Sequence, residues 1–115
     1  MSGERMRRVD VAMRQVLGEA LAQDVKDPRV GFVTVTDVKT SPDLRHARVY
    51  VSVLGDEPAQ QASLDGLHSA QGFLQSRVAS ELRLKRTPEL AFELDLTAER
   101  AARLEEILHE EERRA

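Results

Sequence analysis

The sequence predicts a single α+β domain in which helices cover one face of a three-stranded sheet. Two observations predict this class. The hydrophobic periodicity changes along the chain in the order helix, strand, strand, helix, helix, strand, helix, with no internal repeat. The length of 115 residues, 41% of them hydrophobic, suits one sizeable core. These features argue against a two-domain enzyme and against a chain that is disordered throughout.

The first helix is predicted from Met6 to Val25. Its apolar residues recur every three or four positions and so share one face of a helix. They are Met6, Val9, Met13, Val16, Leu17, Ala20 and Leu21. Pro28 ends this helix, because a proline disfavours helical backbone in the preceding Asp27 and has no N–H to donate.

Two strands are predicted next, at residues 30–40 and 47–54, joined by the turn residues 41–43. The first is rich in β-branched residues, and its apolar parity changes between Val35 and Val38, which indicates a bulge or a doubly buried stretch. The second alternates strictly between apolar and other residues, as a strand buried on one face does. Together they predict an antiparallel hairpin.

Two helices and a third strand follow. A helical stripe runs from Leu64 to Leu84, but Gly72 interrupts it. Because a glycine inside a helix costs about 1 kcal/mol relative to alanine, two helices meeting at a kink near residues 70–72 are favoured over one straight helix. Thr87-Pro88 ends the second of these helices, and the alternation from Leu90 to Leu96 predicts a strand.

A last amphipathic helix is predicted to begin at Thr97, a suitable N-cap, and to fray into the charged residues 110–114. We therefore expect a main domain over residues 1–96 and a C-terminal amphipathic helix with a charged tail over residues 97–115.

Charge and cysteine content narrow the possible functions. The chain holds 17 Lys and Arg against 20 Asp and Glu, so nucleic-acid binding would have to come from local basic patches. The lack of cysteine excludes disulfides, thiol catalysis and Cys-ligated zinc, and it fits a reducing cytosol. No signal-peptide core and no run of eighteen apolar residues is found, so we expect a cytoplasmic protein that does not enter a membrane.

The sequence offers no motif for catalysis or for a cofactor. The three histidines, His46, His68 and His109, lie far apart, and none belongs to a metal-binding pattern. The glycines form neither a GxxxxGK[ST] loop nor a GxGxxG turn. We therefore expect no catalytic residues, no metal and no cofactor.

Two basic clusters are candidates for phosphate contacts. The first comprises Arg5, Arg7 and Arg8, and the second comprises Arg77, Arg83, Lys85 and Arg86. The alternative is an ordinary solvated surface, which for the second cluster also complements a helix C-terminus. Aromatic residues are scarce, so RNA binding should rest on phosphate contacts and shape rather than on base stacking.

Several short strings occur in a fixed order. They are Arg8-Val9, KDPRV at 26–30 leading into VTVT at 33–36, ARVYVSV at 47–53, Ala70-Gln71-Gly72, and LKRTPELAF at 84–92. Their order and spacing, which cover about residues 6–96, closely resemble those of the bacterial ribosome-binding factor A family. Each string alone is a weak signal, whereas the set is highly specific.

The resemblance implies a type II KH-like fold in which the kink at residues 70–72 replaces the GxxG loop that clamps phosphates in ordinary KH modules. It also implies a non-enzymatic, monomeric assembly factor that binds the immature small (30S) ribosomal subunit. Such a factor contacts 16S rRNA, promotes late maturation including 5′-end processing, and supports growth in the cold. The expected partners are this rRNA, ribosomal proteins and a release GTPase.

Carried over by position, the resemblance predicts a set of RNA-binding residues. They are Arg7, Arg8, Arg29, Gln71, Arg77, Arg83, Lys85 and Arg86. Ala70 and Gly72 would form the kink, although tight packing of the two helices would equally explain both residues. Arg29 could instead belong only to the helix stop and turn of residues 27–29.

A second hypothesis assigns the chain to another class, a protein-interaction module. In this case Leu104, Ile107 and Leu108 on the C-terminal helix dock in a groove of a partner, and the basic clusters are merely solvated.

Overall fold

The computed structural model describes residues 2–114, with side chains for residues 3–97 and 105–113. The elements are α1 (Ser2–Gln23), β1 (Val33–Thr40), β2 (His46–Val53), α2 (Glu57–Ser69), α3 (Gln71–Glu81), β3 (Glu89–Leu94) and α4 (Thr97–Arg114). Their types and order are those predicted, so the α+β class is confirmed. Their ends differ from the predicted ones by a few residues.

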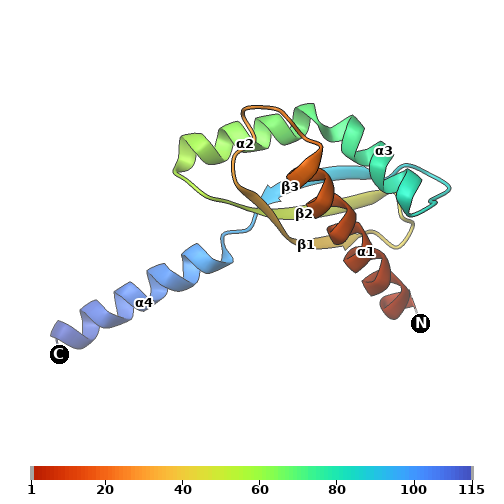
Figure 1. The fold of residues 1–115 in the computed structure, drawn as a ribbon. Helices are drawn as coiled ribbons and strands as arrows, with labels where there is room; N and C mark the ends of the chain where they lie inside the picture. Colours follow the sequence, from red (N-terminus) through yellow and green to blue (C-terminus); the bar gives the residue numbers. More distant parts are fainter. Residues whose placement is uncertain (1, 115) are drawn as a thin grey trace.

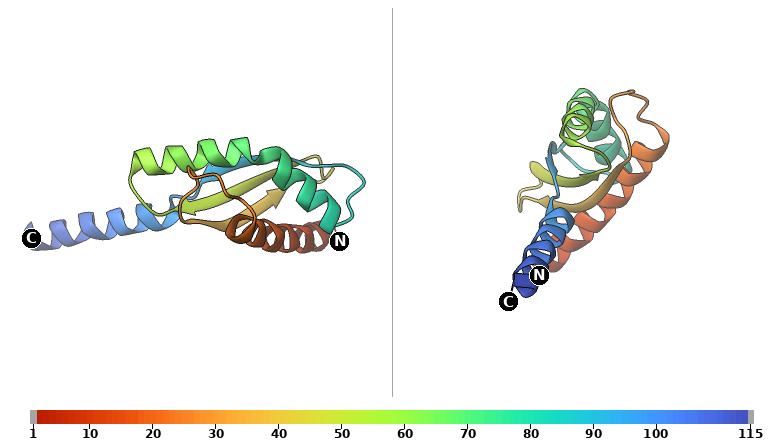
Figure 2. Two further views of the ribbon diagram at one scale, coloured as in Figure 1. Left: turned by 45° about the horizontal axis from the view of Figure 1, so that its top comes forward. Right: turned by 90° about the vertical axis from the view of Figure 1, so that its left-hand side faces the viewer.

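The sheet is mixed and has the order β1-β2-β3. β1 pairs with β2 in the antiparallel hairpin that was predicted, while β2 and β3 are parallel. The register shifts between Val35 and Asp37, which confirms the bulge. The helices α1, α2 and α3 lie on one face of this sheet and leave the other face open (Figures 1 and 2).

The core lies between the sheet and these three helices. Its buried apolar residues are Met13, Val16, Leu17, Ala20, Leu21, Val35, Val38, Ala47, Val49, Val51, Val53, Leu67, Leu74, Val78, Leu90 and Phe92. Burial of each large side chain contributes about 1.5–3 kcal/mol. Leu74 is fully buried whereas the neighbouring Phe73 is 46% exposed, so Leu74 continues the apolar stripe into α3.

The predicted kink is confirmed, because α2 ends at Ser69 and α3 begins at Gln71. Just before it, Gly66 lets the turn of residues 28–31 approach α2, since a Cβ at Gly66 would lie 2.6 Å from Cγ2 of Val30. The sequence had predicted a strand from residue 30. β1 begins only at Val33, because residues 28–31 form a turn that packs against α2.

α4 continues from β3 after two residues and projects away from the body of the molecule (Figure 1). Thr97 is the first residue of the helix, and its N–H donates to Oδ1 of Asp95 at 3.0 Å. The other oxygen of Asp95 accepts from the Thr36 hydroxyl at 2.7 Å, so the bulge of β1 ties down the start of α4. Within residues 2–114 no helix is long and apolar enough to cross a membrane.

Candidate functional site

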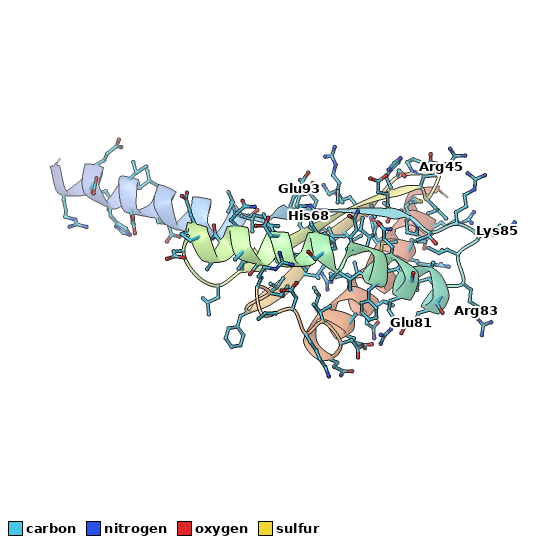
Figure 3. The ribbon with its side chains drawn as sticks, turned by 90° about the horizontal axis from the view of Figure 1, so that it is seen from above. Arg45, His68, Glu81, Arg83, Lys85 and Glu93 are labelled. Atoms are coloured by element: carbon cyan, nitrogen blue, oxygen red, sulfur yellow. The ribbon has the colours of Figure 1, made fainter. Side chains whose placement is uncertain are left out.

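Four basic side chains gather at the end of the molecule where the β1–β2 turn meets the loop between α3 and β3. We call Arg45, Arg83, Lys85 and Arg86 the basic end. The N–H of Glu89 donates to the carbonyl oxygen of Arg45 at 2.8 Å, which joins the turn to the start of β3. Figure 3 shows Arg45, Arg83 and Lys85 at the same end of the molecule, pointing outward.

The backbone of the α3–β3 loop holds the side chains of Arg83, Lys85 and Arg86 in solvent. Leu84 packs against the core and Pro88 is buried, so the loop is anchored on both sides of Lys85 and Arg86. Arg83 has φ of 52°, a left-handed conformation at the position after a helix where glycine is usual. The N–H groups of Arg83 and Leu84 donate to the carbonyls of Ser80 and Ala79, which completes a Schellman motif.

The cations of this loop have no acidic partner among the described side chains. No carboxylate lies within salt-bridge distance of Arg83, Lys85 or Arg86 in that part of the chain, and Arg45 has only Asp43, at 4.0 Å. Sequence reasoning missed Arg45, because nothing in the turn itself indicates that β3 brings it beside the loop. The three loop cations of the basic end can therefore bind an anion without first leaving a described carboxylate.

Arg77, predicted to contact RNA, lies between two carboxylates. Its guanidinium is 2.8 Å from Oδ2 of Asp24 and 2.7 Å from Oε1 of Glu81. The hydrogen bonds that Arg77 donates to Glu81 and then to Asp24 raise the pKa of its guanidinium. This residue joins the end of α1 to α3, and a phosphate would have to compete with both acids.

Arg29 is occupied in a similar way. It forms a bidentate pair with Asp27, with Nε 3.0 Å from Oδ1 and Nη2 2.7 Å from Oδ2, and it also donates to the Ser69 hydroxyl. The hydrogen bonds from Arg29 lower the pKa of Asp27 to about 2. The turn interpretation of residues 27–29 therefore has a structural basis, because the pair holds the turn and the bond from Arg29 to Ser69 attaches it to the end of α2.

Gln71, predicted to contact RNA, forms a hydrogen bond with the backbone of β3 at the edge of the sheet. Its Nε2 donates to the carbonyl of Leu90 at 2.7 Å, and Oε1 of Gln75, one helical turn later, accepts from the N–H of Leu90 at 3.0 Å. β3 is an edge strand, and the two glutamines satisfy backbone groups that a further strand would otherwise take.

The predicted cluster at the start of α1 is more exposed. Arg8 forms a surface pair with Glu4 at 3.6 Å, which is worth little in solvent. Arg7 lines a hollow of about 200 Å³ together with Arg14 and Lys39. Two acids, Asp10 and Asp37, line the same hollow.

The kink borders a wider hollow beside the basic end. This hollow has a volume of about 630 Å³ and is lined by Arg45, His68, Gln71, Gly72, Gln75, Thr87 and Glu89. A Cβ placed on Gly72 would meet nothing within 4 Å, so helix packing does not explain this glycine. Ala70, in contrast, is partly buried and packs against the core.

The described residues offer no metal centre, since no three of their His, Cys, Asp or Glu side chains could hold an ion. His46 is 3.7 Å from Glu89, and His68 packs edge-on against Phe92. Fold and site together define a small α+β protein with a basic end.

Comparison with known proteins identifies the family. The model of the family described as ribosome-binding factor A matches residues 5–108. The chain belongs to the ribosome-binding factor A family, as the short strings in the sequence had indicated.

Solved structures of the family have the same fold. The crystal structure of ribosome-binding factor A from Thermus thermophilus is 28% identical, with a TM-score of 0.68 over 77% of this chain and 94% of that one. A solution structure of a Thermotoga maritima protein assigned to the same factor is 37% identical, with a TM-score of 0.71 over 77% and 85%.

A third structure describes a complex. It is a homology model of the Thermus thermophilus factor fitted into a cryo-EM map of a 30S complex, 29% identical, with a TM-score of 0.63 over 75% of this chain and 90% of that one. These matches confirm the fold as that of the family, while the type II KH-like description remains a prediction.

Proposed function

We propose that this protein binds the small ribosomal subunit, contacts its 16S rRNA and promotes late maturation, including 5′-end processing, without catalysing a reaction itself. Membership of the ribosome-binding factor A family supports this function, as does the fitting of a relative into a map of a 30S complex.

The basic end carries the proposal. Three cations of one loop, Arg83, Lys85 and Arg86, are exposed and have no carboxylate partner in the part of the chain that the structure describes. Such cations bind phosphates by releasing condensed counterions, and they need not read bases. A chain with a formal net charge of −3 can bind RNA in this way only if its positive charge is concentrated locally.

We assign the phosphate contacts to the basic end, with Arg7 and Arg8 at the start of α1 as a second group. Gly72 leaves space for an RNA backbone to approach the kink closely, because no side chain or backbone fills the position of a Cβ there. Arg29, Arg77 and Gln71 support the fold through the contacts described above, and we propose that they contribute to binding only through it.

The proposal extends to organisation and partners. Residues 1–96 would carry the RNA-binding surface, and residues 97–115 would form an accessory helix and tail. The protein would act as a cytoplasmic monomer that contacts ribosomal proteins as well as rRNA, and a GTPase would release it after maturation.

Co-sedimentation with separated ribosomal subunits across a salt series tests the function. We expect saturable binding to the small subunit alone, which weakens steeply as salt rises because each neutralised phosphate releases counterion. Absence of binding at low salt to both mature and precursor small subunits would contradict the proposal.

A second candidate function is docking on a protein through α4. The observation in its favour is that Ile107 and Leu108 are 48% and 51% exposed on a helix that leaves the body (Figure 2). Apolar docking of this kind is not weakened by salt as phosphate binding is. A salt-insensitive interaction that disappears on removal of residues 97–115 would favour this function.

A further inference from the structure

A second exposed surface lies at the other ends of β1 and β2, away from the basic end. Phe32 and Leu54 are 81% and 76% exposed, the highest values among the large apolar side chains that the structure describes. The N–H of Leu54 donates to the carbonyl of Phe32 at 3.1 Å, so the two residues are held next to each other. Large apolar side chains grouped in this way commonly mark a binding surface.

Two shallow hollows adjoin these side chains and meet at Gly55. One, of about 430 Å³, is lined by Phe32, Thr34, Ser52, Val53, Leu54 and Gly55. The other, of about 890 Å³, is lined by Gly55, Asp56, Glu57, Pro58, Gln60, Gln61, Leu94 and Leu96. We call the surface formed by Phe32, Leu54, Leu94 and Leu96 the apolar end.

The backbone that separates the hollows is fixed. Gly55 has φ of +133°, a backbone conformation that residues other than glycine rarely adopt. A Cβ there would lie 2.8 Å from Cβ of Ala59. Asp56 then caps α2 by accepting the N–H of Ala59 at 3.0 Å. A surface held by such constraints is formed before any partner arrives, which lowers the entropy cost of binding.

Two acidic side chains line the larger hollow of the apolar end. Among the side chains that the structure describes, no Lys or Arg lines either hollow, whereas Asp56 and Glu57 line the larger one. The sequence has no Lys or Arg from Val49 to Ser76, and none from Thr87 to Glu99. Such a surface repels phosphates and attracts cations, so its electrostatics suit a basic protein segment and not RNA.

We propose that the apolar end docks a basic protein segment whose apolar side chains fill the two hollows, on the same ribosomal subunit whose RNA the basic end contacts. This inference rests on the proposed function. It divides the molecule into an RNA-binding end and a protein-binding end, which would fix the orientation of the protein on the subunit in addition to its affinity.

Site-specific photo-cross-linking tests the nature of the contact. The full chain carries benzoylphenylalanine at position 32 in one preparation and at position 85 in another, and each is irradiated with purified small subunits. We expect the product from position 32 to resist ribonuclease and to yield peptides of a ribosomal protein, and the product from position 85 to be sensitive to ribonuclease.

The outcomes separate this inference from the proposed function. In one outcome position 85 cross-links to RNA, while position 32 cross-links to RNA, to a second copy of the chain or to its own α4, or gives no product. This outcome overturns the protein-docking inference and leaves the proposed function standing. If the chain does not sediment with the subunit at all, both are overturned.

Affinity measurements give a second test. The double variant Phe32→Ser with Leu54→Ser removes the apolar contacts from exposed positions and is expected to weaken binding to the small subunit about tenfold, with the dependence on salt unchanged. Phe73→Ser is the matched control, because Phe73 is also exposed but lies outside both hollows. Equal affinities for the double variant and the wild type would overturn the inference.

Discussion

Arg77 and the α3–β3 loop show how differently the fold treats cations that are close in sequence. Arg77 lies between Asp24 and Glu81, while Arg83, Lys85 and Arg86 are exposed and have no described carboxylate partner. An RNA phosphate must displace two acids to bind Arg77, but it meets no such competitor at the loop. Net positive charge in a sequence string therefore does not identify a phosphate site, because the surrounding acids decide which cations remain available.

The largest expected effect comes from reversing the charges of the loop. We expect the triple variant Arg83→Glu, Lys85→Glu, Arg86→Glu to weaken binding to the small subunit about 100-fold or more. The slope of the logarithm of affinity against the logarithm of salt should fall by about 2–3, as expected for three lost phosphate contacts. The urea midpoint of unfolding should barely change, because the three side chains are exposed.

The matched control is Arg77→Gln, which removes a cation of the same original cluster. Here the urea midpoint should fall, because Asp24 and Glu81 lose the guanidinium between them, whereas the affinity of the folded protein and its salt slope should stay close to those of the wild type. A normal urea midpoint combined with a large loss of affinity would show that Arg77 binds RNA directly. Arg77 would then not differ in role from the cations of the α3–β3 loop.

Gln71 extends the comparison to a neutral side chain. Gln71→Ala leaves the carbonyl of Leu90 without its 2.7 Å donor, and we expect a loss of about 1 kcal/mol in the free energy of unfolding. Subunit affinity at a temperature well below unfolding should not change. Urea titration and co-sedimentation of the same preparation measure both quantities, and a loss of affinity at unchanged stability would restore Gln71 to the RNA-binding set.

Arg83 is expected to show the opposite behaviour, in which stability and binding move in different directions. Its left-handed backbone is strained for a residue with a Cβ, so Arg83→Gly should stabilise the fold by about 1 kcal/mol. The same change should weaken binding several-fold, since one phosphate contact is lost. Lys85→Ala is the control, because it removes a charge from the same loop without relieving any strain, and an Arg83→Gly variant with unchanged affinity would indicate that the charge at this position has no role.

The sequence could predict the elements because their signals are local. Strict alternation in β2, the helical stripe of α1 and the glycine at the kink each depend on neighbouring residues, and the structure confirms all three. The end of α3 was predicted too late, at Thr87-Pro88, because Leu84 continues the apolar stripe although the Schellman motif at Arg83 has already ended the helix.

The candidate site could be predicted only in part, because the state of a cation depends on contacts distant in sequence. Asp24, in the turn that follows α1, pairs with Arg77, and the Ser69 hydroxyl accepts from Arg29 across the fold. Arg45 joins the basic end only through the pairing of its carbonyl with β3. No local pattern marks these contacts, so the two candidate clusters looked equivalent before the fold was known.

The pair of Asp27 and Arg29 gives the smallest expected effect, which is confined to acid pH. The folded state holds the pKa of Asp27 at about 2, below its ordinary value of 3.8, so this carboxylate favours folding fully above about pH 4. Its contribution should decline as the pH falls from about 4 to about 2, where the folded state also becomes protonated. We expect urea midpoints measured over this range to fall less steeply for Asp27→Asn than for the wild type, with subunit binding at neutral pH unchanged in the folded variant. Parallel pH profiles for the two proteins would show that Asp27 and Arg29 do not hold the turn against α2, and Arg29 would then be free to bind phosphate as the loop residues do.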